Sequence, residues 1–230
     1  MKELIGRVLS FQRDDYPRQS GLYGQLAANG QRPSTLMISC ADSRVVPEHI
    51  TRAAPGDLFV CRNAGNIVPP FAQANGGVTA TVEYAVAVLG VTDVVVCGHS
   101  DCGAMKALMK PDTLAGLPNV AAWLRHAHAA ECVVRQSYPE LDDAAGARAA
   151  ALENVVVQLA HLRTHPSVAA AIAKGGLALH GWFFDIEAGQ VLALDGDTGR
   201  FRPIEEGGPL AIALRPEPRR AAEFSLEAAA

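Results

Sequence analysis

The chain has 230 residues, of which 49% are hydrophobic and 19% are charged, a balance typical of a soluble globular protein with a full core. Its formal net charge of -4 and the lack of a Lys and Arg cluster argue against a nucleic-acid partner, because phosphate contacts require basic patches. No apolar run approaches the ~20 residues that span a bilayer, and residues 1–6 lack a secretory-signal pattern. We therefore expect a cytoplasmic protein without a membrane partner, whose five cysteines are free thiols.

Strands and a helix alternate in the first half of the chain. We expect strands at 35–39, 58–61 and 93–97, because each is a continuous apolar run bounded by turn residues, as in strands covered on both faces. The apolar spacing over 77–89 predicts a helix that ends at Gly90. A strand, helix and strand in succession predict a parallel sheet with a right-handed crossover.

The second half changes from helices to strands. Helices are expected over 119–134, 145–162 and 167–173, and the segments 177–186 and 190–194 predict an antiparallel hairpin. The fold class that follows is α/β, with a mainly parallel central β-sheet flanked by helices and a C-terminal antiparallel hairpin strand.

The end of the chain differs in composition. We expect residues 1–204 to form a single domain. Residues 205–230 are rich in Glu, Gly, Pro, Arg and Ala without a sustained period, which predicts a mobile tail.

Two short polar clusters each follow a predicted strand, namely Cys40-Ala41-Asp42-Ser43-Arg44 and His99-Ser100-Asp101-Cys102. Ligands bind at the carboxyl ends of strands in open α/β sheets, so we expect the two clusters to meet. Two thiolates and one imidazole, from Cys40, His99 and Cys102, are a ligand set typical of catalytic zinc, which keeps a fourth position for water. We therefore predict a Zn²⁺ site, although H-x-x-C alone is a weak motif.

Asp42 and Arg44 follow the first of these ligands. Two thiolates weaken the pull of zinc on a bound water, so we expect Asp42 to accept a hydrogen bond from that water while Arg44 keeps the carboxylate ionised. The alternative is a structural ion pair that ties down a loop. Cys97 is an alternative ligand, because strand alternation places it on the same face as His99.

With these residues in place, the chain resembles the β-class carbonic anhydrases. The matching blocks occur in the family's order, at 39–45, 55–66, 83–86, 97–103 and 180–185. The resemblance implies reversible hydration of carbon dioxide to bicarbonate and a proton by attack of zinc-bound hydroxide, in a homodimer or homotetramer. It implies that Cys40, His99 and Cys102 hold the Zn²⁺ and that Asp42 and Arg44 form the family's dyad. In some members the Asp leaves the Arg and binds the metal, which closes the site.

The resemblance also implies residues that bind substrate. Gln31 matches a Gln that in plant-type members donates a hydrogen bond to substrate across the subunit interface. Phe59 and Tyr84 match residues that line an apolar pocket suited to carbon dioxide, with core packing as the alternative for both rings. We expect Gln31 and the backbone amide of Gly103 to stabilise charge on the substrate oxygens. Met37 stands where members regulated by a bicarbonate pocket carry Trp, so we do not expect that regulation.

Two other functions stay open at the level of sequence. Relatives with the same fold hydrolyse carbon disulfide or carbonyl sulfide with the same ligands, and the shape of the tunnel rather than a motif separates them. A regulatory zinc-binding module without turnover would use Asp42 as a permanent fourth ligand. Arg44 argues against such a module, because it competes for that carboxylate.

Overall fold

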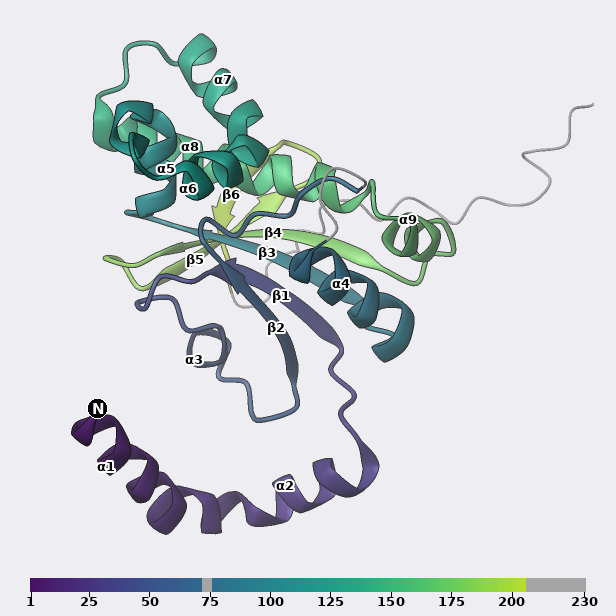
Figure 1. Ribbon diagram of the computed structural model, residues 1–230. Coiled ribbons are helices and arrows are strands. Elements are labelled where there is room, and N and C mark those ends of the chain that lie inside the picture. Colours follow the sequence, from purple (N-terminus) through teal and green to yellow (C-terminus); the bar gives the residue numbers. More distant parts are fainter. Residues whose placement is uncertain (72–75, 206–230) are drawn as a thin grey trace, which may run out of the picture.

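A six-stranded sheet in the order β2-β1-β3-β4-β5-β6 forms the centre of the computed structural model, which describes residues 1–71 and 76–205 (Figure 1). β1 pairs in parallel with β2 and β3, and β3 pairs in parallel with β4. β5 and β6 continue the sheet in antiparallel orientation. The predicted α/β class with its mainly parallel sheet is confirmed. The strands are β1 (Thr35–Cys40), β2 (Leu58–Asn63), β3 (Asp93–His99), β4 (Ala178–Asp185), β5 (Gln190–Asp195) and β6 (Arg200–Pro203).

The predicted hairpin is present as β4 and β5, but it does not close the sheet. β6 pairs with β5, with Arg200 opposite Asp195 and Pro203 opposite Leu192. The sequence analysis did not predict β6, because a strand of four residues, three of them exposed, is too short to display an alternating pattern.

Helices cover the parallel strands (Figure 1). The buried side chains of β1 and β3 pack with those of α4, α8 and α9 in one core, and a second core joins α5, α6 and α7 to α8. The predicted helices 145–162 and 167–173 correspond to α8 and α9. The helices of the body are α3 (Pro47–Thr51), α4 (Gly77–Glu83) with η2 (Tyr84–Leu89), α5 (Gly103–Met109), η3 (Pro111–Leu114), α6 (Pro118–Leu124), η4 (Arg125–Ala127), α7 (His128–Ser137), α8 (Asp143–Leu162) and α9 (Pro166–Ala173).

Two predicted helices differ in detail from the structure. The helix over 77–89 ends at Gly90, with φ of 69°, as expected, but its second half is the π-helical η2. The prediction of one helix over 119–134 is wrong, because α6, η4 and α7 divide this segment. Gln158 Nε2 donates to the His126 carbonyl oxygen at 3.2 Å, so a tertiary contact binds a carbonyl at the break.

An N-terminal arm lies apart from the body of the fold, at the bottom of Figure 1. It consists of α1 (Lys2–Ser10), η1 (Phe11–Asp15) and α2 (Tyr16–Asn29), and it contains no buried residue. The side chains of Leu4, Ile5, Val8 and Leu9 on α1 are between 49% and 59% exposed. A helix with such an apolar stripe normally packs it against another surface.

Among residues 1–71 and 76–205, no helix has both the length and the apolar character needed to cross a bilayer. Apart from Glu205, the tail predicted over 205–230 lies outside the described residues, so the domain boundary at 204 stays a prediction.

Candidate metal centre

The two polar clusters meet at the carboxyl edge of the parallel strands. Cys40 is the last residue of β1 and His99 is the last residue of β3, its parallel neighbour, while Cys102 directly precedes α5. One ligand atom from each of the three side chains lies within 4.8 Å of the other two. All three residues are buried, with His99 at 0% exposure. The chain thus brings together three potential metal ligands from segments far apart in sequence.

His99 presents one ring nitrogen to this cluster. Its Nδ1 lies 2.8 Å from the Ser100 carbonyl oxygen, so Nδ1 carries the hydrogen and donates it. Nε2 is then left with a free electron pair, and this buried atom has no hydrogen-bond partner within the described residues. Buried polar atoms are normally paired. A metal ion bound at Nε2 satisfies this atom, and a backbone carbonyl at the other nitrogen is the usual support for a ligating imidazole.

The two thiols shift each other's pKa in opposite directions. The nearby Cys102 thiol is the largest reason why the pKa of Cys40 is lowered, and the Gly65 N–H, which points at Cys40 Sγ, acts in the same direction. The pKa of Cys102 is raised, first by the nearby Cys40 and then by burial. A divalent cation bound between the two sulfurs would favour loss of the proton from both thiols. This donor set fits Zn²⁺.

Cys97 lies outside this cluster. It packs with Met37 and Val95 in a small apolar group, and burial raises the pKa of its thiol to about 12. Within the described residues, the group placed to hold a metal contains Cys40, His99 and Cys102 without Cys97. Cys97, the alternative ligand suggested by strand alternation, is therefore part of the core.

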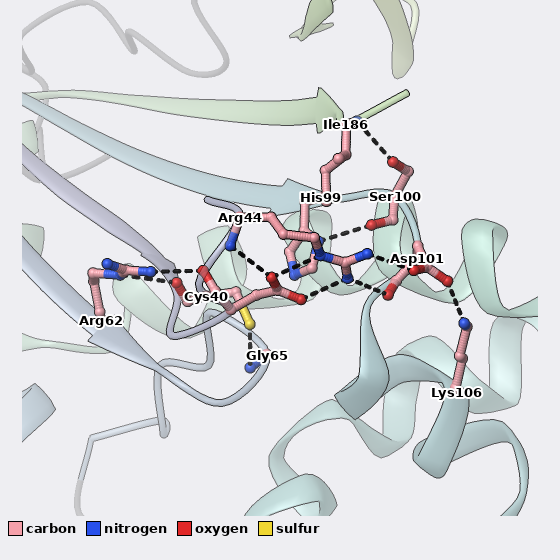
Figure 2. Close-up of polar contacts among 10 residues, drawn as sticks. Cys40, Arg44, Arg62, Gly65, His99, Ser100, Asp101, Lys106 and Ile186 are labelled. Carbon is pink, nitrogen blue, oxygen red and sulfur yellow. Dashed lines mark hydrogen bonds and ion pairs between the residues drawn. The ribbon is translucent and has the colours of Figure 1, made fainter. Parts of the chain in front are cut away.

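Asp42 and Arg44 form the ion pair expected from the sequence. Arg44 donates from Nε to Asp42 Oδ1 at 3.0 Å and from Nη2 to Oδ2 at 2.7 Å, and its backbone N–H donates to Oδ1 at 3.0 Å (Figure 2). These contacts hold the pKa of Asp42 far below its usual range, chiefly through the guanidinium. The carboxylate next to the ligand cluster is therefore ionised.

Asp101 is a second partner of Arg44 that the sequence analysis did not identify. Arg44 Nη1 donates to Asp101 Oδ2 at 2.7 Å, and Lys106 pairs with Oδ1 of the same carboxylate (Figure 2). The three residues border a surface hollow of about 420 Å³, which Arg148 and Asp185 also line. The only signal in the sequence is the place of Asp101 between His99 and Cys102.

Two buried amides on α8, Asn154 and Gln158, hold the segment around Gly65, which contacts the cluster. Asn154 Nδ2 donates to the Gly65 carbonyl oxygen at 2.9 Å, and Gln158 Nε2 donates to Asn154 Oδ1 at 2.8 Å. Both side chains are fully buried. Gly65 in turn directs its N–H to Cys40 Sγ at 3.4 Å. The sequence analysis missed this pair, although two amides four residues apart in an apolar helix are a usable signal for a buried network.

Of the residues expected to bind substrate, Gly103 lies at this cluster, whereas Phe59 and Tyr84 lie away from it within one chain. Phe59 and Tyr84 lie together, with ring centroids 5.9 Å apart, and Phe59 also packs against the core. Phe59 lies opposite Leu36 on β1, four positions before Asn63, which lies opposite Cys40. At the rise of a strand, this offset is about 13 Å. Gln31 is exposed in the segment after α2, and Gly103 is the first residue of α5, next to Cys102.

The chain is similar to known proteins both in sequence and in fold. Residues 35–191 match the family model described as carbonic anhydrase. A carbonic anhydrase of Pseudomonas aeruginosa is 53% identical over 206 residues, which are 90% of this chain and 93% of that relative.

Two solved structures extend the comparison. The β-carbonic anhydrase CcaA superposes with a TM-score of 0.89 at 42% identity, over 94% of this chain and 96% of that one. A structure from work on two tetrameric β-carbonic anhydrases of Sordaria macrospora has a TM-score of 0.73 at 32% identity, over 84% of this chain and 95% of that one. The chain belongs to the carbonic anhydrase family and, within it, to the β class.

Proposed function

We propose that Zn²⁺ held by Cys40, His99 and Cys102 serves the carbonic anhydrase reaction of this chain, the reversible hydration of carbon dioxide to bicarbonate and a proton. The observation that carries the proposal is the buried His99 Nε2, which has no hydrogen-bond partner within the described residues and belongs to a cluster with Cys40 and Cys102 whose ligand atoms lie within 4.8 Å of one another. When bound there, zinc supplies the Lewis acidity that brings the pKa of a water molecule to about 7.

Asp42 is proposed to orient that water. Its carboxylate is ionised and lies two residues from Cys40, so it can accept a hydrogen bond from a water at the fourth metal position. Arg44 occupies both carboxylate oxygens, which keeps Asp42 from acting as a ligand. This arrangement supports turnover over a closed, non-catalytic zinc module. Hydrolysis of carbon disulfide or carbonyl sulfide is not favoured, because the similar chains described above are carbonic anhydrases.

The substrate pocket is proposed to form between two subunits. Phe59 and Tyr84 form an apolar pair about 13 Å along the sheet from Cys40, a distance at which they cannot line the same chain's metal site. A second copy brings its own pair, with Gln31, to this site. The backbone amide of Gly103 and the Gln31 amide are then proposed to donate to the substrate oxygens.

The assembly is proposed to be a homodimer or homotetramer. The apolar stripe of α1 has no cover within the described chain, and a second copy of the chain supplies a matching surface. The Sordaria macrospora relatives are described as tetrameric. A cytoplasmic location is also proposed, because a reducing compartment suits a protein whose five cysteines are free.

Stopped-flow carbon dioxide hydration on protein of measured zinc content tests the function, with carbon disulfide and carbonyl sulfide as comparison substrates. We expect hydration to rise with pH as the bound water ionises, and Cys40→Ser to lose both zinc and activity. Cys132→Ser, outside the cluster, is the matched control and should keep both. Hydration no faster than in buffer with zinc fully bound would refute the proposal, and turnover of the sulfur substrates alone would favour the rival hydrolase.

A further inference from the structure

Arg44 divides its side-chain donors between two carboxylates. Nε and Nη2 bind Asp42, whereas Nη1 binds Asp101 Oδ2 at 2.7 Å and Nη2 also reaches the Asp101 carbonyl oxygen at 3.2 Å. Figure 2 shows the Arg44 guanidinium beside Asp101, with Lys106 on the other side of that carboxylate. We propose that Asp101 is a positioning residue, which holds Arg44 in the orientation that keeps Asp42 away from the fourth metal position.

Asp101 is well placed for this role. It lies between His99 and Cys102, so its contacts to Arg44 join the segment that carries Cys40 to the segment that carries the other two ligands. Its φ of 58° lies in the left-handed region, which Asp, Asn and Gly adopt more readily than other residues. In this conformation both its carboxylate and its backbone oxygen meet the same guanidinium.

Lys106 allows two acidic residues to share one arginine. It pairs with Asp101 Oδ1, whereas Arg44 takes Oδ2, so each oxygen of the outer carboxylate has a cationic partner. The repulsion between Asp101 and Asp42 is therefore offset by two cations rather than one.

Arg44 needs an outer contact because its side chain is 45% exposed, whereas that of Asp42 is 17% exposed. Without Asp101, the side of the guanidinium that faces away from Asp42 is exposed to water, and hydrogen bonds to water compete with those to Asp42. When Arg44 turns toward water, Asp42 loses two hydrogen bonds, and its free carboxylate is a ligand that zinc accepts. Asp101 thus acts on the metal centre through Arg44 and Asp42.

The test uses Co²⁺-loaded protein and inorganic azide, whose binding to the metal changes the visible absorption of Co²⁺. Asp101→Gly removes the carboxylate and suits the positive φ, while Asp101→Asn keeps the size and one acceptor. Asp42 competes with azide for the fourth position, so the apparent azide Kd should rise when Asp101 no longer holds Arg44. We expect a rise of about three- to fivefold in Asp101→Gly, which is the change in a binding constant that corresponds to the loss of an exposed ion pair. The rise should be smaller in Asp101→Asn. Asp143→Asn, which removes the partner of Lys110 at the start of α8, should leave the Kd unchanged.

A second set of variants separates positioning from general damage. In the Asp42→Asn background, Asp101→Gly should produce no further change in azide Kd, because a neutral amide is a poor ligand. An azide Kd equal to wild type in both Asp101 variants, or a shift that persists without the Asp42 carboxylate, would overturn the inference.

The inference rests on the proposed metal centre, and the same titration tells the two apart. Wild-type protein that shows neither thiolate-to-Co²⁺ absorption nor a response to azide would overturn the metal centre and this inference with it. Wild-type protein that shows both, with Asp101 variants that match it, would overturn only the role of Asp101.

Discussion

At the candidate metal centre, individual hydrogen bonds determine which side-chain atoms are free to bind a metal or a water. His99 Nδ1 is occupied by the Ser100 carbonyl, which leaves Nε2 for a metal. The Asp42 carboxylate accepts three hydrogen bonds from Arg44. Its negative charge therefore stays next to the site, while both of its oxygens are held by Arg44. The sequence indicated these residues by type and spacing. It did not indicate Asp101, because the Arg44 contact joins residues 57 positions apart.

Asp42→Asn tests the proposed restraint of water. The neutral amide is a weaker acceptor for the water proton, so kcat should fall by about 10²-fold, at the lower end of the effects of general acid and base groups. Zinc content should stay at the wild-type level, because the ligands are untouched. Stopped-flow rates and elemental analysis measure both. Asp112→Asn, an exposed carboxyl in η3, is the control, and an unchanged rate in Asp42→Asn would remove Asp42 from the mechanism.

At the scale of elements, α8 and the sheet together position the site. The polar face of α8 fixes the segment around Gly65, and the parallel strands bring Cys40 and His99 to one edge. The parallel strands were predictable because each is a continuous apolar run. The break between α6 and α7 was not, and there a carbonyl oxygen accepts a hydrogen bond from Gln158, on a helix that comes later in the chain. Local periodicity contains no signal for such a contact.

Asn154→Leu tests the support that α8 gives to Gly65. The change leaves the Gly65 carbonyl and Gln158 Nε2 with one partner fewer in a buried position, so the free energy of unfolding should fall by about 1–3 kcal/mol. Urea unfolding of the zinc-loaded protein measures it. Val156→Ala on the exposed side of the same helix should change it by less than about 0.5 kcal/mol. Equal losses in both variants would mean that Asn154 has no special role.

The β4–β5 turn predicts a pH-dependent contribution to stability. The Ala188 N–H, and after it Arg148, lower the pKa of Asp185 at the end of β4. A carboxyl with a lowered folded-state pKa stabilises the fold fully above its unfolded pKa of about 3.9 and loses this effect as pH falls through the folded value. Asp185→Asn should therefore lower the free energy of unfolding by about 0.5–1 kcal/mol at pH 7, and the difference should shrink toward pH 3. Urea unfolding at both pH values measures this, with Glu187→Gln as control, and a pH-independent difference would contradict it.

At the scale of the whole molecule, the residues proposed to form the active site do not all lie together in one chain. The three candidate metal ligands meet within the chain, but Phe59 pairs with β1 four positions before the residue opposite Cys40, and its ring lies beside that of Tyr84. The N-terminal arm was not predicted, although the apolar residues of α1 recur at helical spacing, because no other segment of the described chain fully buries this stripe. The expectation that Gln31 contacts substrate across a subunit interface came from the resemblance to the β class, because a single chain contains no such interface.

Charged residues on the arm should disturb the assembly. Ile5→Glu together with Leu9→Glu places two carboxylates in the apolar stripe of α1, and burial of these charges against a second copy is costly. We expect the assembly to shift toward smaller species in light scattering after size-exclusion chromatography, and carbon dioxide hydration to fall with it. Gln25→Glu on α2 is the control. An unchanged mass would show that α1 is not part of the interface.

In the proposed assembly, the offset between Phe59 and Cys40 along the sheet means that each reaction centre combines residues of two polypeptides. Two variants with defects in different parts of this centre, Cys40→Ser and Phe59→Ala, should then complement each other when unfolded together and refolded as a mixture. In a mixed dimer, one centre combines intact ligands with an intact ring and the other combines both defects, so random pairing restores about a quarter of all centres. Activity above that of either variant alone would be the signature of an active site assembled from two copies of the chain.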